Sequence, residues 1–168
     1  MKKSFNNFHY IELEIFYSEI SMDLLQSIRD SLINTYGKVL KVFIGDELEL
    51  FKQAFDIRRN QYNAEILLKY LTANKNKELA LWVTKRDIYI SGMNFIFGLA
   101  QYLNGSVLSI FRLSNKELVE KEAIHEVGHV LGLKHCNNNC VMQYSNSLLE
   151  AEIKSSCLCK ECREKLML

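Results

Sequence analysis

The stretch from residue 125 to residue 142, HEVGHVLGLKHCNNNCVM, concentrates side chains that can bind a metal ion or transfer a proton. His125 and His129 are four residues apart in a predicted helix, so both imidazoles project from one face of it. Gly132 allows the chain to turn sharply away from the helix axis, and His135 can then return as a third ligand. Three protein nitrogens leave one coordination position of a zinc ion open, which a catalytic zinc needs and a structural zinc does not. The spacing therefore predicts a catalytic zinc site.

Glu126 lies between the two helical histidines and supplies the group that such a site needs for hydrolysis. Zinc lowers the pKa of a bound water to about 7, and a neighbouring carboxylate can take the proton that this water releases. The pattern H-E-x-x-H alone also occurs on ordinary helices, but the longer H-E-x-x-H-x-x-G-x-x-H adds a glycine and a third histidine at fixed spacing. We therefore predict that Glu126 is a general base at a zinc site. Zinc binding without useful turnover stays open as an alternative.

The five cysteines of the chain all lie between residues 136 and 162. Cys136 and Cys140 are separated by three residues, and Cys159 and Cys162 form C-x-x-C. Four thiolates in two such pairs suit a closed, tetrahedral structural zinc, and a reducing compartment favours a metal site over disulfides. Buried free thiols or a redox pair are the alternative. Cys157 lies too close to Cys159 in sequence to share a metal with it easily, so we leave it out of the ligand set.

Size and charge narrow the class of protein. The chain has 168 residues, of which 48% are hydrophobic, and this predicts one globular domain whose core needs no disulfides. A net charge of +1 argues against nucleic-acid binding driven by bulk positive charge. The N-terminal sequence lacks the apolar region of a secretion signal, and no apolar run reaches the roughly eighteen residues of a membrane span. We therefore expect a cytoplasmic monomer that binds neither membranes nor nucleic acid.

The residues upstream of the histidines predict the elements that position the site. Alternating or continuous apolar patterns predict strands at 8–17, 38–45 and 78–85. Helical patterns predict helices at 21–37 and 56–74, and in the second helix four residues are expected to face inward, namely Ile66, Leu67, Tyr70 and Leu71.

Two turn signals precede the histidines. Asn104 and Gly105, within 94–113, predict a hairpin with a two-residue turn. Ser114 and Glu117 predict a capping box that starts the histidine-bearing helix at about residue 115. Beyond it the sequence is polar and cysteine-rich, with a short helix expected at 160–167.

This order of elements predicts the α/β class. We expect a three-layer-like sandwich with a mixed, mostly parallel sheet of about five strands, one of them antiparallel. An active-site helix follows the sheet, and a zinc-binding C-terminal tail packs beneath it. Residues 1–168 are expected to form a single domain, with the sheet and the active-site helix in 1–132 and the cysteine site in 133–168.

The C-terminal half of the chain resembles the archaemetzincins, a family of metzincin-like zinc metallopeptidases. The family pattern is HExxHxxGxxHC, four residues, C-x-M, a spacer of about seventeen residues and CxxC. This chain has HEVGHVLGLKHC, then NNN, then CVM, a spacer of sixteen residues and CKEC. The resemblance extends upstream to NFIFGLA and downstream to YSNSLLEAEIK. The first cysteine pair is one residue closer than in the family pattern, but C-x₃-C is still a normal spacing for zinc ligands.

What the resemblance implies is a metallopeptidase with two Zn²⁺ per chain, one catalytic and one structural. The family's catalytic zinc ligands match His125, His129 and His135, and its general base matches Glu126. Its structural zinc ligands match four cysteines, namely Cys136, Cys140, Cys159 and Cys162. Met142 matches the methionine of the Met-turn, which lies beneath the catalytic metal, so residues 133–168 would contain both this turn and the cysteine site. The strand containing FGLAQYL matches the upper rim of a cleft, with which an extended peptide could pair.

Tyr144, two residues after Met142, departs from the family pattern, which carries phenylalanine there. Astacin-like and serralysin-like metzincins are similar in having a tyrosine at this offset, where its hydroxyl reaches the zinc site. Tyr144 could therefore donate to the oxyanion that forms at the attacked carbonyl. Simple packing of the ring under the turn is the alternative that we favour.

The function predicted from these patterns is zinc-dependent hydrolysis of peptide bonds, with a peptide or protein as substrate. The alternative is a catalytically weak or inactive two-zinc scaffold that binds peptides or protein partners, which would not need Glu126. A zinc-ribbon nucleic-acid binder is disfavoured because the basic residues of the C-terminal tail are interspersed with glutamates.

Overall fold

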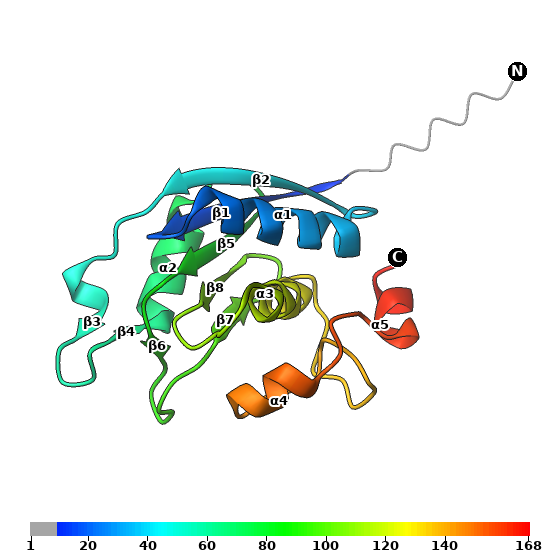
Figure 1. Ribbon diagram of the computed structural model, residues 1–168. Helices are drawn as coiled ribbons and strands as arrows, with labels where there is room; N and C mark the ends of the chain where they lie inside the picture. The colour runs from blue at the N-terminus through cyan, green and yellow to red at the C-terminus, as the bar shows by residue number, and fades with distance from the viewer. Residues whose placement is uncertain (1–9) are drawn as a thin grey trace, which may run out of the picture.

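A five-stranded sheet lies at the centre of the computed structural model, which describes residues 10–168 (Figure 1). In chain order the elements are β1 (Ile11–Ser18), α1 (Met22–Tyr36), β2 (Leu40–Glu47), the 3₁₀ helix η1 (Lys52–Ala54), β3 (Phe55–Asp56), β4 (Gln61–Asn63), α2 (Ala64–Asn74), β5 (Leu79–Thr84), β6 (Ile88–Tyr89), β7 (Gly98–Gln101), β8 (Gly105–Ser109), α3 (Lys116–Val130), α4 (Leu148–Ile153) and α5 (Lys160–Lys165).

The strand order of the large sheet is β2-β1-β5-β8-β7. The first four strands run parallel, and β7 runs antiparallel to β8 at the edge. All six residues of β5 are buried, as its continuous apolar sequence requires in the middle of such a sheet. The prediction of a mostly parallel sheet with one antiparallel strand is confirmed.

Helices cover both faces of this sheet. Residues of β5 alternate between the faces, so that Leu81 joins the core under α1 and α3 while Trp82 joins the core under α2. In Figure 1, α1 and α3 lie on one side of the sheet and α2 on the other. The result is the expected three-layer α/β arrangement, with the histidine-bearing helix α3 packed directly on the sheet.

The helix predicted at 56–74 is wrong in its first part. Residues 55–63 contain the short strands β3 and β4, which form a second small sheet with β6. Asn63 ends this segment and caps α2, because its side chain accepts from the backbone N–H groups of Glu65 and Ile66. Ile66 and Tyr70 are 39% and 41% exposed, so the prediction that they face inward is also wrong.

Smaller corrections concern the first strand, the hairpin and the start of α3. The strand predicted at 8–17 begins at Ile11, and residues 8 and 9 lie outside the described residues. Gly105 pairs with Gln101 across the hairpin, so the loop has three residues rather than the predicted two. Leu103 adopts a φ of 49° within this loop and donates to Val130 O (2.8 Å), which ties the loop to α3. The N-cap of α3 is Asn115 rather than Ser114.

The C-terminal tail packs beside α3 through two short helices (Figure 1). The sequence patterns predict α5 but not α4. The ammonium group of Lys121, which is buried on α3, donates to the backbone carbonyls of Ala151, Glu152 and Lys154 at the end of α4. No further helical turn supplies N–H donors to these carbonyls, so the donation by Lys121 satisfies them and fixes the tail against α3. Within residues 10–168, no helix combines the length and hydrophobicity that a membrane crossing requires.

Candidate metal centre and substrate cleft

Three histidines converge at the C-terminal half of α3. His125 and His129 are one turn apart on α3, and His135 follows after the chain turns at Gly132. The φ of Gly132 is 97°, in the left-handed region that favours glycine. The ring nitrogens that could bind a metal lie within 4.8 Å of one another. The structure thus brings the three sequence-predicted ligands together.

Backbone carbonyls fix the two helical imidazoles. Val141 O lies 2.8 Å from His125 Nδ1, and Leu133 O lies 2.7 Å from His129 Nδ1. A carbonyl oxygen can only accept, so each Nδ1 must carry its ring's proton, and each Nε2 of a neutral ring then has a free lone pair. The two Nε2 atoms are 3.1 Å apart. Because lone pairs this close repel each other unless a cation binds to them, the donor set fits a zinc ion.

Burial keeps these rings neutral, which metal binding requires. Burial, followed by the charge of Lys154, lowers the pKa of His125 to about 2. Burial also lowers the pKa of His129 and of His135. At neutral pH the three side chains therefore offer nitrogen lone pairs rather than positive charge.

The carboxyl group of Glu126 is buried between α3 and β7. A Cβ added at Gly98, the first residue of β7, would overlap this carboxyl group, so only glycine allows the strand to approach so closely. Burial, followed by the charge of Glu122, raises the pKa of Glu126 to about 8. The fold therefore holds a carboxyl group with a raised proton affinity on the helix that carries the histidines.

Met142 lies fully buried beneath α3. A Cβ at Gly128 would come within 2.5 Å of the Met142 sulfur, so this helical glycine makes room for the methionine. The backbone N–H of Cys136 donates to Met142 O (3.0 Å), which ties the segment after His135 to the turn around Met142.

Four cysteine sulfurs form a second cluster in the tail, those of Cys136, Cys140, Cys159 and Cys162. They lie within 4.8 Å of one another, and none of them is in a disulfide. A hydrogen bond from the backbone N–H of Cys162 is the main reason why the pKa of Cys159 is lowered to about 6. Burial instead raises the pKa of Cys140. Four sulfurs converging from two segments fit a closed zinc site. Cys157 is exposed and is not part of this cluster.

The comparisons with known proteins agree with this arrangement. The sequence profile of Peptidase family M54 matches residues 5–167. The chain belongs to peptidase family M54, the archaemetzincins. It is 43% identical to the archaemetzincin of Archaeoglobus fulgidus over 145 residues, which is 80% of this chain and 88% of that protein. The family is one of metallopeptidases.

Several solved structures share the fold of this chain. The Archaeoglobus fulgidus archaemetzincin complexed with malonate has a TM-score of 0.83 at 36% identity, covering 92% of this chain and 99% of that one. The Methanopyrus kandleri archaemetzincin has a TM-score of 0.85 at 33% identity, covering 94% of each chain. A zinc-dependent peptidase from Methanocorpusculum labreanum has a TM-score of 0.80 at 25% identity, covering 92% of this chain and 99% of that one.

In this chain a cleft of about 480 Å³ opens beside the histidines. One wall is the apolar segment from Ile90 to Tyr102, which includes β7. The rest of the lining comes from α3 (Glu122, His125, Glu126 and His129), from His135, from the segment from Tyr144 to Asn146, and from Lys154. Because β7 is the edge strand of its sheet, the cleft has the free strand edge that the FGLAQYL resemblance implies.

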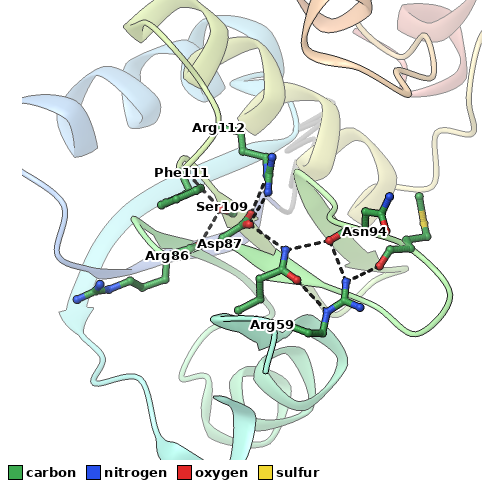
Figure 2. A network of polar contacts seen from close by, with 9 residues as sticks. Arg59, Arg86, Asp87, Asn94, Ser109, Phe111 and Arg112 are labelled. Carbon is green, nitrogen blue, oxygen red and sulfur yellow. Dashed lines mark hydrogen bonds and ion pairs between the residues drawn. The ribbon is translucent and has the colours of Figure 1, made fainter. Parts of the chain in front are cut away.

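A polar network behind the apolar wall holds it in place (Figure 2). Asp87 is buried and accepts from both Arg112 Nε and Arg112 Nη2 (3.0 and 2.7 Å). The guanidinium of Arg59 donates to Met93 O and Asn94 O (2.7 and 2.9 Å), at the bend that leads into the wall. Backbone carbonyls of a loop that would otherwise rely on water thus accept hydrogen bonds from Arg59, which lies in the turn between β3 and β4.

The inner end of the cleft contains a buried ion pair. Lys154 Nζ lies 2.7 Å from Glu122 Oε1, and both side chains are at most 3% exposed. The same ammonium lies 3.3 Å from His125 Nδ1. Sequence patterns gave no indication of this pair, because Glu122 reads as an ordinary helix residue and Lys154 lies in the polar tail.

Gly98 and Gly128 are further residues that the sequence analysis missed. A single glycine within a strand or helix pattern is a signal for close approach of another chain segment, but it does not identify that segment. Tyr144 is half-exposed, and its ring centroid lies 4.8 Å from that of His135. Its side chain therefore faces the cleft instead of packing under the turn.

Proposed function

We propose that this chain hydrolyses peptide bonds with Glu126 as its general base, and that His125, His129 and His135 hold the catalytic zinc. The observation that carries this proposal is the position of the Glu126 carboxyl group. It is buried against Gly98 of β7, and it belongs to the same helix as His125 and His129, whose Nε2 atoms lie side by side. A second zinc in the cluster of four cysteines would have a structural role.

The chain's own residues divide the work between binding and proton transfer. When bound, the zinc ion would polarise the scissile carbonyl and lower the pKa of a water molecule. The edge of β7 would orient an extended peptide by backbone hydrogen bonds. Glu126 would accept the proton of the attacking water and deliver it to the leaving amine. Burial raises the proton affinity of this carboxyl group, which favours the step in which it accepts the proton.

The rival function is a two-zinc scaffold that binds peptides without cleaving them. Both functions use the cleft and both metal clusters, so neither feature discriminates between them. A buried carboxyl group with a raised pKa costs stability and serves no purpose in a scaffold, which is why we favour hydrolysis.

The test is digestion of a diverse peptide library by the purified protein with two zinc ions per chain. The matched control is Glu126→Gln, prepared identically, which keeps the size of the side chain and exposes any contaminating protease. Cleavage by the wild type but not by the variant supports the proposal. The proposal is contradicted if the wild type and Glu126→Gln cleave the peptides equally well. It is also contradicted if the wild type with two bound zinc ions cleaves none of them.

A further inference from the structure

The inner end of the cleft has polar groups with unused hydrogen-bonding capacity inside apolar walls. Ile90, Ile96, Phe97 and Leu99 line the apolar side. Glu122, Lys154 and Ser145 are among the polar residues that line the same cleft. An apolar pocket with a few fixed polar groups is the usual design of a selective subsite.

The ion pair does not use all of its donors and acceptors. An ammonium group has three N–H donors, and within the described residues the Lys154 ammonium has Glu122 Oε1 and His125 Nδ1 as its neighbours. The second of these cannot accept, because His125 Nδ1 donates its own proton to Val141 O. At least one N–H of Lys154 is therefore free to donate.

A hydroxyl group that belongs to the lining of the same cleft, that of Ser145, is also unused. Ser145 Oγ is inaccessible to solvent and has no hydrogen-bond partner among residues 10–168. A buried polar atom without a partner costs about 1–3 kcal/mol unless a ligand or water supplies one. Ser145 and Lys154 together thus define a place where the polar end of a ligand would gain hydrogen bonds.

We propose that Glu122, Lys154 and Ser145 form a selective subsite for a tyrosine side chain of the substrate. The proposal rests on the proposed peptidase function. The apolar walls would contact the ring, and the phenolic hydroxyl, which both donates and accepts, would bond with the polar groups at the inner end. A phenylalanine of nearly the same shape would fill the walls but leave these polar groups unsatisfied. Sites built to bond a hydroxyl discriminate strongly against the analogue that lacks it.

The direction of β7 indicates which substrate residue enters the subsite. The apolar walls lie at the Gly98 end of this edge strand. We take the peptide to pair antiparallel with β7, since antiparallel pairs are the more common in sheets. The carboxyl-terminal part of the peptide then lies at the Gly98 end, so the subsite takes the residue that follows the scissile bond.

The experiment compares peptides that are identical except for tyrosine or phenylalanine at the residue after the scissile bond. A second peptide pair carries the same exchange before the scissile bond. We expect kcat/KM of the wild type to favour tyrosine by about tenfold or more in the first pair only, in line with the cost of an unpaired buried polar group. Dissociation constants of the same peptides with Glu126→Gln should show a preference of the same direction without any turnover.

Replacement of the ion pair tests the residues themselves. The double substitution Lys154→Met with Glu122→Leu makes the inner end apolar, and buried ion pairs are often exchanged for hydrophobic residues without loss of stability. We expect the tyrosine preference to vanish or reverse. The matched control is Lys160→Met with Glu164→Leu, which removes an exposed pair of the same charges on α5 and should keep the preference. Ser145→Ala is the smaller second variant, and it should reduce the preference even if the double variant fails to fold.

The outcomes separate this proposal from the proposed function. If the wild type cleaves no peptide, the proposed function is wrong, whereas the Glu126→Gln binding data still test the subsite. If it cleaves both members of each pair equally well, the subsite proposal is wrong and the peptidase proposal stands. A tyrosine preference that persists in both the double variant and Ser145→Ala also overturns it, because the preference would then not depend on these three residues.

Discussion

The histidine cluster and the cysteine cluster differ in the structure that surrounds them. Two histidines lie on α3, a helix of 15 residues packed on the central sheet, and their ring orientations are fixed by backbone carbonyls. The cysteines lie on loops and on α5, a helix of six residues. The cleft beside the histidines is lined by all three histidines and by none of the four clustered cysteines.

This difference indicates two uses of the same metal-binding chemistry. A site on a regular element holds its ligands in place before the metal binds and leaves room for a substrate. A site on loops gains its order from the metal and supplies folding energy in return. The histidine cluster thus suits catalysis, and the cysteine cluster suits support of the tail. Four substitutions would break or sharpen this distinction.

The largest effect is expected from Glu126→Gln. The glutamine keeps the shape but cannot accept a proton, so kcat should fall by about 10²–10⁴-fold while both zinc ions and the melting temperature are retained. The matched control is Glu161→Gln, which removes a carboxylate beside the cysteine cluster, where Asn138 Nδ2 donates to Glu161 Oε2 (3.2 Å). Unchanged turnover in Glu126→Gln, or an equal loss of turnover in Glu161→Gln, would contradict the distinction. Catalysis would then not be confined to the histidine cluster, and the cysteine cluster would not serve only to support the tail.

A somewhat smaller loss is expected from Gly98→Ala. The added methyl group would overlap the Glu126 carboxyl and displace it, and a shift of this kind can lower kcat by about 10²-fold. Zinc content should not change, because Gly98 lies against the base and not against a predicted metal ligand. Gly45→Ala is the matched control, since its methyl group would press on the carboxyl group of Glu14, away from the cleft. Full activity in Gly98→Ala would show that β7 does not position the base.

These residues also show what the sequence could and could not predict. The three histidines were predictable because a helical repeat and one glycine turn bring them together within eleven residues, His125 to His135. The sheet was predictable because its strands have long apolar patterns. The contact of Gly98 with Glu126 joins two elements across the fold, and no local pattern contains that information.

The errors have the same origin. Residues 56–63 have a helical pattern, but Tyr62 pairs with Ile88 in the small sheet, and this distant partner overrides local propensity. Lys154 lies in a polar tail that looks solvent-exposed in sequence. Its burial depends on Lys121, which holds the end of α4 against α3, and on Glu122, which pairs with it.

Cys140→Ser tests whether the two clusters are independent. Cys140 is bonded in sequence to Val141, whose carbonyl accepts from His125 Nδ1. Loss of the structural metal should loosen this acceptor, and outer contacts of this kind typically change metal affinity by about 10–100-fold. Competition with a chromophoric chelator would measure zinc affinity at the histidines. The control is Cys157→Ser, outside the cluster. Native affinity in folded Cys140→Ser protein would show that the coupling does not exist.

The smallest effect is expected from Tyr144→Phe, which removes one hydroxyl group from the cleft. The ring lies against His135 and is half-exposed, so the side chain can reach the region where a scissile carbonyl would be attacked. A phenolic donor to the developing oxyanion acts only in the transition state, so kcat should fall by about tenfold while KM barely changes. The loss should be smaller than for a rigid backbone donor, because an exposed side chain must be ordered first. Zinc affinity at the histidines, measured in parallel, should stay native, since the ring contact with His135 is kept. A wild-type kcat in this variant would assign Tyr144 to ring packing alone, and a raised KM would instead indicate a contact with the bound peptide.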